Sequence, residues 1–305
     1  MEIAIRTLSR TTKKHLGTAK SATIALAASL VLSACSSDIT PASEQSGAFG
    51  GTAGQNAGVL DQPITHIHGV ARDPITQSVV MATHEGAFER RDGGWYGRGD
   101  VVDLMGFAIA PDGTWFASGH PGFDTDLPQP VGLIASTDRG QTWQTLSRGG
   151  ESDFHVLAVG PAGVLGFDGT LRASADGTRW DEASIPAPPV DLAVNRATGA
   201  VLATTEQGLL QSTDDLATWA PLDPPESVVL VDWVDEETIV ATTAANRVLL
   251  SHDAGQSWEA GSPLSVEVQA LGAHLLPSGK TEILVATQNG VLKSLDFGST
   301  FVQVP

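Results

Sequence analysis

The stretch STDRGQTW at Ser136–Trp143 recurs in four further copies along this chain of 305 residues. The other copies are SADGTRW at Ser174–Trp180, STDDLATW at Ser212–Trp219, SHDAGQSW at Ser251–Trp258 and SLDFGSTF at Ser294–Phe301. From one closing aromatic residue to the next the steps are 37, 39, 39 and 43 residues, in the range of four-stranded propeller blades. The repeat therefore predicts an all-β fold with one sheet per repeat.

Each copy holds the residues that a tight hairpin turn needs. An Asp carboxylate accepts hydrogen bonds from backbone amides ahead of it, glycine adopts a positive φ, and Ser and Thr hydroxyls join the turn to its flanks. The five aspartates are Asp138, Asp176, Asp214, Asp253 and Asp296. The second copy is one residue short, and the third has Leu216 where the others have glycine. We expect these two turns to be distorted.

The repeat resembles the pattern S-x-D-x-G-x-T-W of the Asp-box, or bacterial neuraminidase repeat, propellers. The match covers residues 64 to 304. This resemblance implies a β-propeller in which the Asp boxes are structural. It does not identify the chemistry, because the motif occurs in sialidases, other glycoside hydrolases, assembly factors and sorting receptors alike.

Short apolar strands separated by turn residues run from Ile64 onward and divide into six blades. The first blade lacks a full Asp box and has the turn RDGGW at Arg91–Trp95 instead. The expected blades are residues 66–97, 103–146, 153–183, 190–222, 228–260 and 266–304. We therefore predict that residues 63–305 form one six-bladed β-propeller of four-stranded antiparallel blades with Asp-box hairpins.

The first 34 residues have the features of a bacterial signal peptide. A basic start precedes an apolar run at Ala22–Leu32 that is too short to cross a bilayer. The run ends in LSAC at Leu32–Cys35, which resembles the lipobox of lipoproteins; the alternative is an ordinary secretory signal. Cys35 is the sole cysteine, so no internal disulfide explains it. We predict lipidation of Cys35, a flexible linker over residues 35–62 and a membrane-anchored, extracytoplasmic location.

The chain after the signal peptide is strongly acidic. The whole sequence has 17 basic and 35 acidic residues. Five of the basic residues and one of the acidic residues lie in the first 34 residues. The remaining 12 basic and 34 acidic residues give a net charge of −22. Only Lys280 and Lys293 remain as lysines and no basic cluster exists, so nucleic acid is not expected as a partner.

Histidines cluster at one face of the predicted propeller. In each blade the start of the first strand and the turn after the second strand should lie around the mouth of the central channel, opposite the Asp boxes. Five of the seven histidines that follow Cys35 fall at these positions in the first three blades, together with three aspartates. The candidate ligand-binding residues are His66, His68, His84, Asp103, His120, Asp153, His155 and Asp168.

Three interpretations of this histidine sector remain open. Imidazoles and carboxylates can ligate a divalent metal such as zinc, for which the candidate ligands are His66, His68, His120 and His155. They can instead bind a glycan, a protein or another polar ligand. Alternatively, they hydrogen-bond strand ends and channel water and serve the fold alone.

Two functions compete on this basis. The first is a lipid-anchored propeller that binds a polar ligand at its mouth. The second is a glycoside hydrolase of sialidase-like fold, which needs a carboxylate pair, or a Tyr nucleophile with a carboxylate partner. The resemblance to sialidases also implies three arginines that bind the substrate. The sole tyrosine, Tyr96, lies on the opposite side and only Arg247 is close to a mouth turn, so a true sialidase is not expected.

The opening blades add a second resemblance. Lipoproteins classed as glycosyl-hydrolase-like have similar segments, which here are THIHG at Thr65–Gly69, ATHEG at Ala82–Gly86, DLMGF at Asp103–Phe107 and SGHPG at Ser118–Gly122. These segments contain most of the mouth histidines. The resemblance therefore implies that the histidine sector, rather than the Asp boxes, distinguishes this group.

Overall fold

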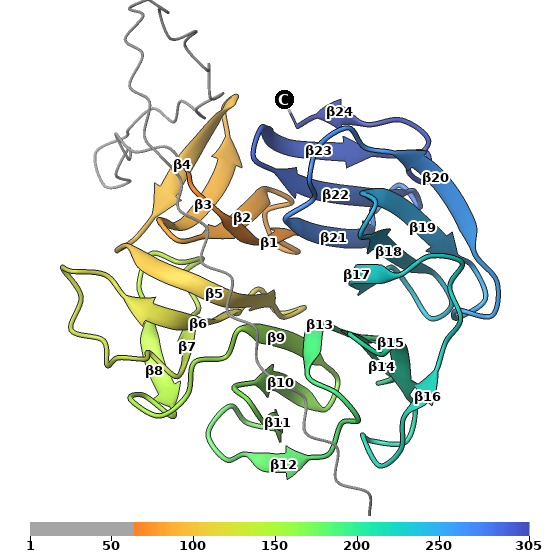
Figure 1. Ribbon diagram of the computed structural model, residues 1–305. Helices are drawn as coiled ribbons and strands as arrows, with labels where there is room; N and C mark the ends of the chain where they lie inside the picture. Colours follow the sequence, from red (N-terminus) through yellow and green to blue (C-terminus); the bar gives the residue numbers. More distant parts are fainter. Residues whose placement is uncertain (1–63, 305) are drawn as a thin grey trace, which may run out of the picture. The chain divides into compact units, whose positions relative to one another are not determined.

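The computed structural model describes residues 64–304, which form 24 strands in six four-stranded sheets (Figure 1). The predicted signal peptide, Cys35 and the linker lie outside the described residues. No helix in residues 64–304 is long and apolar enough to cross a membrane. Each sheet consists of four consecutive antiparallel strands, so the predicted all-β architecture of six four-stranded blades is confirmed.

The blades follow one another along the chain. Blade 1 contains β1 (Ile67–Arg72), β2 (Val79–Thr83), β3 (Gly86–Arg91) and β4 (Gly94–Arg98). Blade 2 contains β5 (Val102–Ile109), β6 (Trp115–Pro121), β7 (Leu133–Ser136) and β8 (Gln144–Ser147). Blade 3 contains β9 (Val156–Gly160), β10 (Gly163–Phe167), β11 (Leu171–Ser174) and β12 (Asp181–Ala183). Blade 4 contains β13 (Pro189–Val194), β14 (Val201–Thr205), β15 (Gly208–Ser212) and β16 (Ala220–Pro221). Blade 5 contains β17 (Val228–Trp233), β18 (Ile239–Thr243), β19 (Arg247–Ser251) and β20 (Glu259–Pro263). Blade 6 contains β21 (Ala270–Leu275), β22 (Thr281–Thr287), β23 (Gly290–Ser294) and β24 (Val302–Gln303).

The first strand of every blade lies at the centre of the ring (Figure 1). Each of these strands contacts the first strand of the next blade, and β1 contacts β21. The centre encloses a cavity of about 150 Å³ whose lining includes Asp191 and Asp232. These carboxylates join neighbouring blades, because Asp191 accepts the Val231 amide at 2.9 Å and Asp232 accepts the Ala273 amide at 2.8 Å. Burial raises the pKa of Asp191 to about 7.

Side chains, rather than a shared strand, close the ring between blades 1 and 6. One apolar cluster combines residues of both blades, including Val70, Met81 and Leu284. Beside it, Arg72 Nη2 lies 2.6 Å from a carboxylate oxygen of the buried Glu282. Burial opposes ionisation of this carboxyl group, but hydrogen bonds from His274 and Arg72 prevail and lower the pKa of Glu282 to about 2.

The Asp boxes form the turns between the third and fourth strands of blades 2 to 6. In the first box the amide and hydroxyl of Thr142 donate to Asp138 at 2.9 and 2.7 Å. The second box differs, since the amides of Thr178 and Arg179 both donate to one oxygen of Asp176. The third box keeps the hydrogen bonds of the first, so the expected distortion there is wrong. Its Leu216 adopts φ 67°, the left-handed conformation that glycine has in the other boxes.

Candidate functional site

The mouth of the propeller is the end at which the first strands begin and the second strands turn into the third. In an antiparallel blade the turn between the third and fourth strands lies at the opposite end, which we call the Asp-box face. Both the predicted mouth positions and the Asp boxes therefore lie where the strand order requires. Blade 1 contributes three histidines to the mouth, namely His66, His68 and His84.

Local backbone geometry explains how these three histidines meet. In the pairing of β1 with β2, Ile67 opposes Thr83 and Gly69 opposes Ala82, so His68 is the extra residue of a β-bulge. Such bulges redirect a side chain out of the regular alternation. His66 directly precedes β1, and His84 lies in the turn that joins β2 to β3. A bulge and a hairpin turn thus bring residues 18 positions apart to one point.

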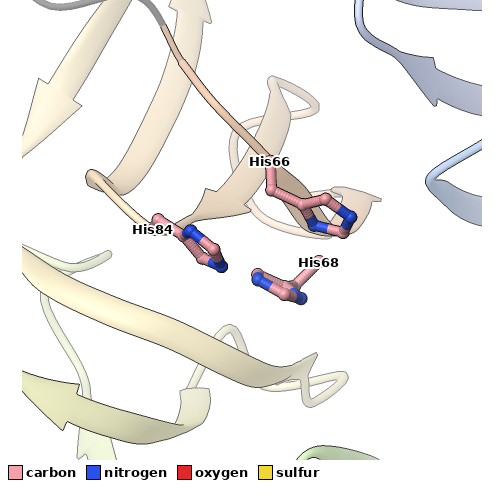
Figure 2. A group of neighbouring side chains, drawn as sticks. All are labelled: His66, His68 and His84. Carbon is pink, nitrogen blue, oxygen red and sulfur yellow. The ribbon is translucent and has the colours of Figure 1, made fainter. Parts of the chain in front are cut away.

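The three imidazoles form a compact group (Figure 2). Ring centroids are 4.5 Å apart for His66 and His68, 4.6 Å for His68 and His84, and 5.6 Å for His66 and His84. One ring nitrogen from each residue lies within 4.8 Å of the others. Figure 2 shows the His84 ring directed toward that of His68. His66 and His84 are exposed and His68 is half-buried.

His68 is held in its neutral form. Burial is the largest cause, and the neighbouring rings of His66, His84 and His155 add to it, so the pKa of His68 falls to about 4. Its Nε2 atom is buried and has no hydrogen-bond partner among residues 64–304. A neutral imidazole with an unpaired ring nitrogen is the form that binds a metal ion.

A second polar group lies in blades 2 and 3. Asp153 Oδ2 is 2.8 Å from His155 Nε2 and 3.3 Å from His120 Nε2. Asp103 is the link to the histidines of blade 1, with an oxygen 4.0 Å from His84 Nε2. Burial raises the pKa of Asp103. The buried atoms Asp103 Oδ1, His120 Nδ1 and Asp153 Oδ1 accept or donate no hydrogen bond within residues 64–304, and Asp103 Oδ1 is the oxygen that lies 4.0 Å from His84 Nε2.

The structure therefore divides the candidate residues into groups that differ from the predicted metal set. It places His84, and not His120 or His155, with His66 and His68. His120 and His155 instead share the carboxylate of Asp153. The sequence placed His84 at the mouth, but the bulge at His68 has no sequence signal that identifies which rings will meet.

The carboxylate of Asp168 is bound by neighbouring side chains of the protein. Its buried carboxylate lies 3.0 Å from Arg172 Nε and accepts a hydrogen bond from Ser152. Although burial opposes ionisation, these hydrogen bonds and the Arg172 charge lower the pKa of Asp168. Asp168 also lines a surface hollow of about 470 Å³, together with Asp153 and His155. That volume is within the range of small-molecule sites.

Comparisons with known proteins identify the fold and not the function. No family model and no curated protein matches the chain. Its fold is similar to that of a gluconolactonase from Xanthomonas campestris, with TM-score 0.59 and 13% identity over 75% of this chain and 86% of that chain. It is also similar to the WD40 β-propeller domain of Doa1, with TM-score 0.54 and 14% identity over 82% and 85%.

An ancestral GH74 enzyme is similar too, with TM-score 0.53 and 14% identity over 82% of this chain and 37% of that chain. This chain thus spans little more than a third of that enzyme. At these identities the similarity shows the β-propeller fold alone. Membership of the Asp-box family stays a prediction from the motif and its spacing.

Proposed function

We propose that this chain is a lipid-anchored, extracytoplasmic Asp-box propeller that binds a transition-metal ion at its mouth through His66, His68 and His84. The observation that carries the metal assignment is the approach of three ring nitrogens to within 4.8 Å of one another. Three imidazoles with a further position open to water or substrate are a known zinc-binding arrangement.

The distances fit such a site after a modest adjustment. Tetrahedral zinc with Zn–N bonds of about 2.0–2.1 Å places its ligand nitrogens about 3.3 Å apart. The outer nitrogens must therefore approach by about 1.5 Å. His66 and His84 are exposed, so their rings can rotate toward His68 without disturbing the core. His68 needs no deprotonation at neutral pH, because its pKa is already lowered to about 4.

The remaining polar groups suit a ligand that occupies the open metal position. His68 and His155 line one pocket of about 160 Å³ at the top of the channel. The unpaired oxygens of Asp103 and Asp153 can accept hydrogen bonds from hydroxyl or amide groups of a glycan or a protein. For the alternative, glycoside hydrolysis, they are also the available carboxylate pair, since Asp168 is bound by Arg172 and Asp191 by backbone amides.

Metal binding is tested on the full chain, purified in detergent and stripped with a chelator. We expect elemental analysis after incubation with Zn²⁺ to find one ion per chain, and His84→Ala to weaken Zn²⁺ binding at least about 100-fold. His252→Ala is the matched control, because His252 lies in the Asp-box turn of blade 5 and packs on Phe297. A wild-type chain that binds no Zn²⁺, or a His84→Ala chain that binds it normally, would refute the proposal.

The anchor is a separate part of the proposal. It is supported by LSAC at Leu32–Cys35 and by the absence of any second cysteine in the sequence. Cell fractionation tests it directly. The wild-type chain is expected in the membrane fraction and Cys35→Ser in the soluble extracytoplasmic fraction or as uncleaved precursor. Equal fractionation of the two mature chains would count against lipidation.

A further inference from the structure

Blades 1, 2, 4 and 5 carry the same backbone irregularity at the mouth, and in blades 4 and 5 the bulge residue is a valine, Val190 or Val229. In blade 1 the bulge residue of the first strand is His68. In blade 2, Leu104 opposes Gly119 and Gly106 opposes Ser118, so Met105 is the unpaired residue of the first strand β5. His68 and Met105 therefore occupy equivalent positions in adjacent blades whose first strands are in contact. A bulge directs both side chains away from the regular sheet faces.

Both residues line the same pocket. This pocket of about 160 Å³ is lined by His68, Met105 and His155, together with apolar residues that include Val190 and Leu230 and the polar residues Asp191 and Gln269. Met105 is half-buried and belongs to none of the apolar core clusters in residues 64–304. Met81, by contrast, is fully buried in the core of blade 1. Met105 thus lines a pocket together with His68 instead of belonging to an apolar core cluster.

The chemistry of a thioether beside three imidazoles selects a particular metal. Imidazole binds zinc and copper alike, whereas thioether sulfur is a soft ligand that favours Cu(I). The methionine side chain has three rotatable bonds and can place its sulfur over a range of positions.

We infer that the mouth site is a copper site, in which Met105 Sδ joins His66, His68 and His84 as the fourth ligand of Cu(I). This inference rests on the proposed metal site and names the ion that it prefers. It requires no electron transfer, because Cu(I) is bound as supplied. The carboxylates Asp103 and Asp153 lie outside this ligand set.

The test compares Cu(I) and Zn²⁺ binding by the full chain under anaerobic conditions. Cu(I) affinity is measured by competition with bicinchoninate, and Zn²⁺ affinity by competition with a chromophoric zinc chelator. We expect Met105→Leu to weaken Cu(I) binding about tenfold or more and to change Zn²⁺ binding less than about threefold. Met81→Leu is the matched control and should change neither affinity beyond about threefold, because Met81 lies in the core. X-ray absorption should detect a sulfur ligand on Cu(I) in the wild-type chain and none in Met105→Leu.

The outcomes separate the inference from the proposed function. A wild-type chain that binds neither ion would overturn the metal site itself. If the wild-type chain binds Zn²⁺ through His84 but binds Cu(I) without a sulfur ligand, only the copper assignment is overturned. The same holds if the wild type and Met105→Leu bind Cu(I) with equal affinity. Loss of Cu(I) binding in Met105→Leu together with retained Zn²⁺ binding also excludes a folding defect as the cause.

Discussion

The two faces of this propeller use the same residue types for different purposes. In the Asp boxes the aspartate oxygens are paired; both oxygens of Asp138, for example, accept hydrogen bonds from residues of its own turn. Arg139 Nε of the same box is buried without a hydrogen-bond partner. At the mouth, buried atoms of His68, Asp103, His120 and Asp153 have no hydrogen-bond partner within residues 64–304. These four atoms are the majority of the seven unpaired buried side-chain atoms in residues 64–304. The comparison agrees with the proposal that the mouth binds a ligand, whereas the Asp boxes stabilise their own turns.

The energetic contrast supports this division. A buried polar atom without a partner costs about 1–3 kcal/mol, so a face with four of them is not optimised for stability. Proteins keep such groups chiefly where a ligand, ion or water satisfies them. Substitutions on the Asp-box face should therefore change the free energy of unfolding, whereas substitutions at the mouth should change binding. The predictions below test this contrast, beginning with the largest expected effect.

Arg72→Met should destabilise the protein by about 3 kcal/mol, measured by urea unfolding. Arg72 ends β1 near the Asp-box face and pairs with the buried Glu282 of blade 6 across the ring closure. Removal of the guanidinium leaves a buried carboxylate with His274 as its remaining partner. Arg91→Met is the control and should cost about 0.5 kcal/mol or less, because Arg91 is partly exposed and its partner Glu89 keeps Arg98.

The same variant should change the pH dependence of stability. The folded-state pKa of Glu282 is about 2, below its ordinary value of 4.5, so the unfolded chain binds the proton first. The stabilisation is present above pH 4.5 and is lost as the pH falls toward 2. Arg72→Met reduces this pKa difference, so its stability should fall less steeply over that range. Parallel curves of unfolding free energy against pH for the wild type and Arg72→Met would contradict the argument that this ion pair closes the ring. An equal loss of unfolding free energy in Arg72→Met and Arg91→Met would contradict it as well.

The fold was more predictable than the site, for a physical reason. Asp-box turns are local structures, and their spacing placed all six blades within a few residues of the observed strands. Leu216 shows the limit of local reasoning. Its residue type disfavours a positive φ, yet the turn keeps its shape, because Ser212 accepts the Leu216 amide, Asp214 accepts the Thr218 amide, and Leu216 packs against an apolar cluster of blades 3 and 4.

The site depended on features that are not local. Strand order alone placed the eight candidate residues in a sector of the mouth, and that part follows from topology. Which rings meet depends on the bulge at His68 and on the direction of the turn at His84, which no residue pattern specifies. The same bulge position in blade 2 presents Met105, which looked like one more apolar residue of a strand. Sequence reasoning therefore placed the candidate residues at one end of the blades but could not specify which of their rings lie together.

Ser136→Ala should destabilise the protein by about 2 kcal/mol. Ser136 is buried, accepts the buried Gly140 amide at 2.7 Å and donates to Asp138 at 2.7 Å. Alanine leaves that amide unpaired inside the first Asp box. The melting temperature should fall by about 4–8 °C, because 1 kcal/mol shifts a domain of this size by about 2–4 °C. Metal binding at the mouth should be unchanged.

His155→Ala is the counterpart at the mouth and should give the smallest effect. Without metal, its free energy of unfolding should lie within about 0.5 kcal/mol of the wild-type value. His155 also makes a short polar contact, 2.8 Å to Asp153, but its side chain is 58% exposed, so water replaces the imidazole when it is removed. A hydrogen bond of similar length thus has a different energetic value on each face, because only the Asp-box partner is left unpaired in the interior. If His155→Ala and Ser136→Ala destabilise equally, the mouth contacts serve folding and the contrast between the faces is lost. If His155→Ala is neutral, the polar groups of the mouth are available for binding at no cost to the stability of the ring.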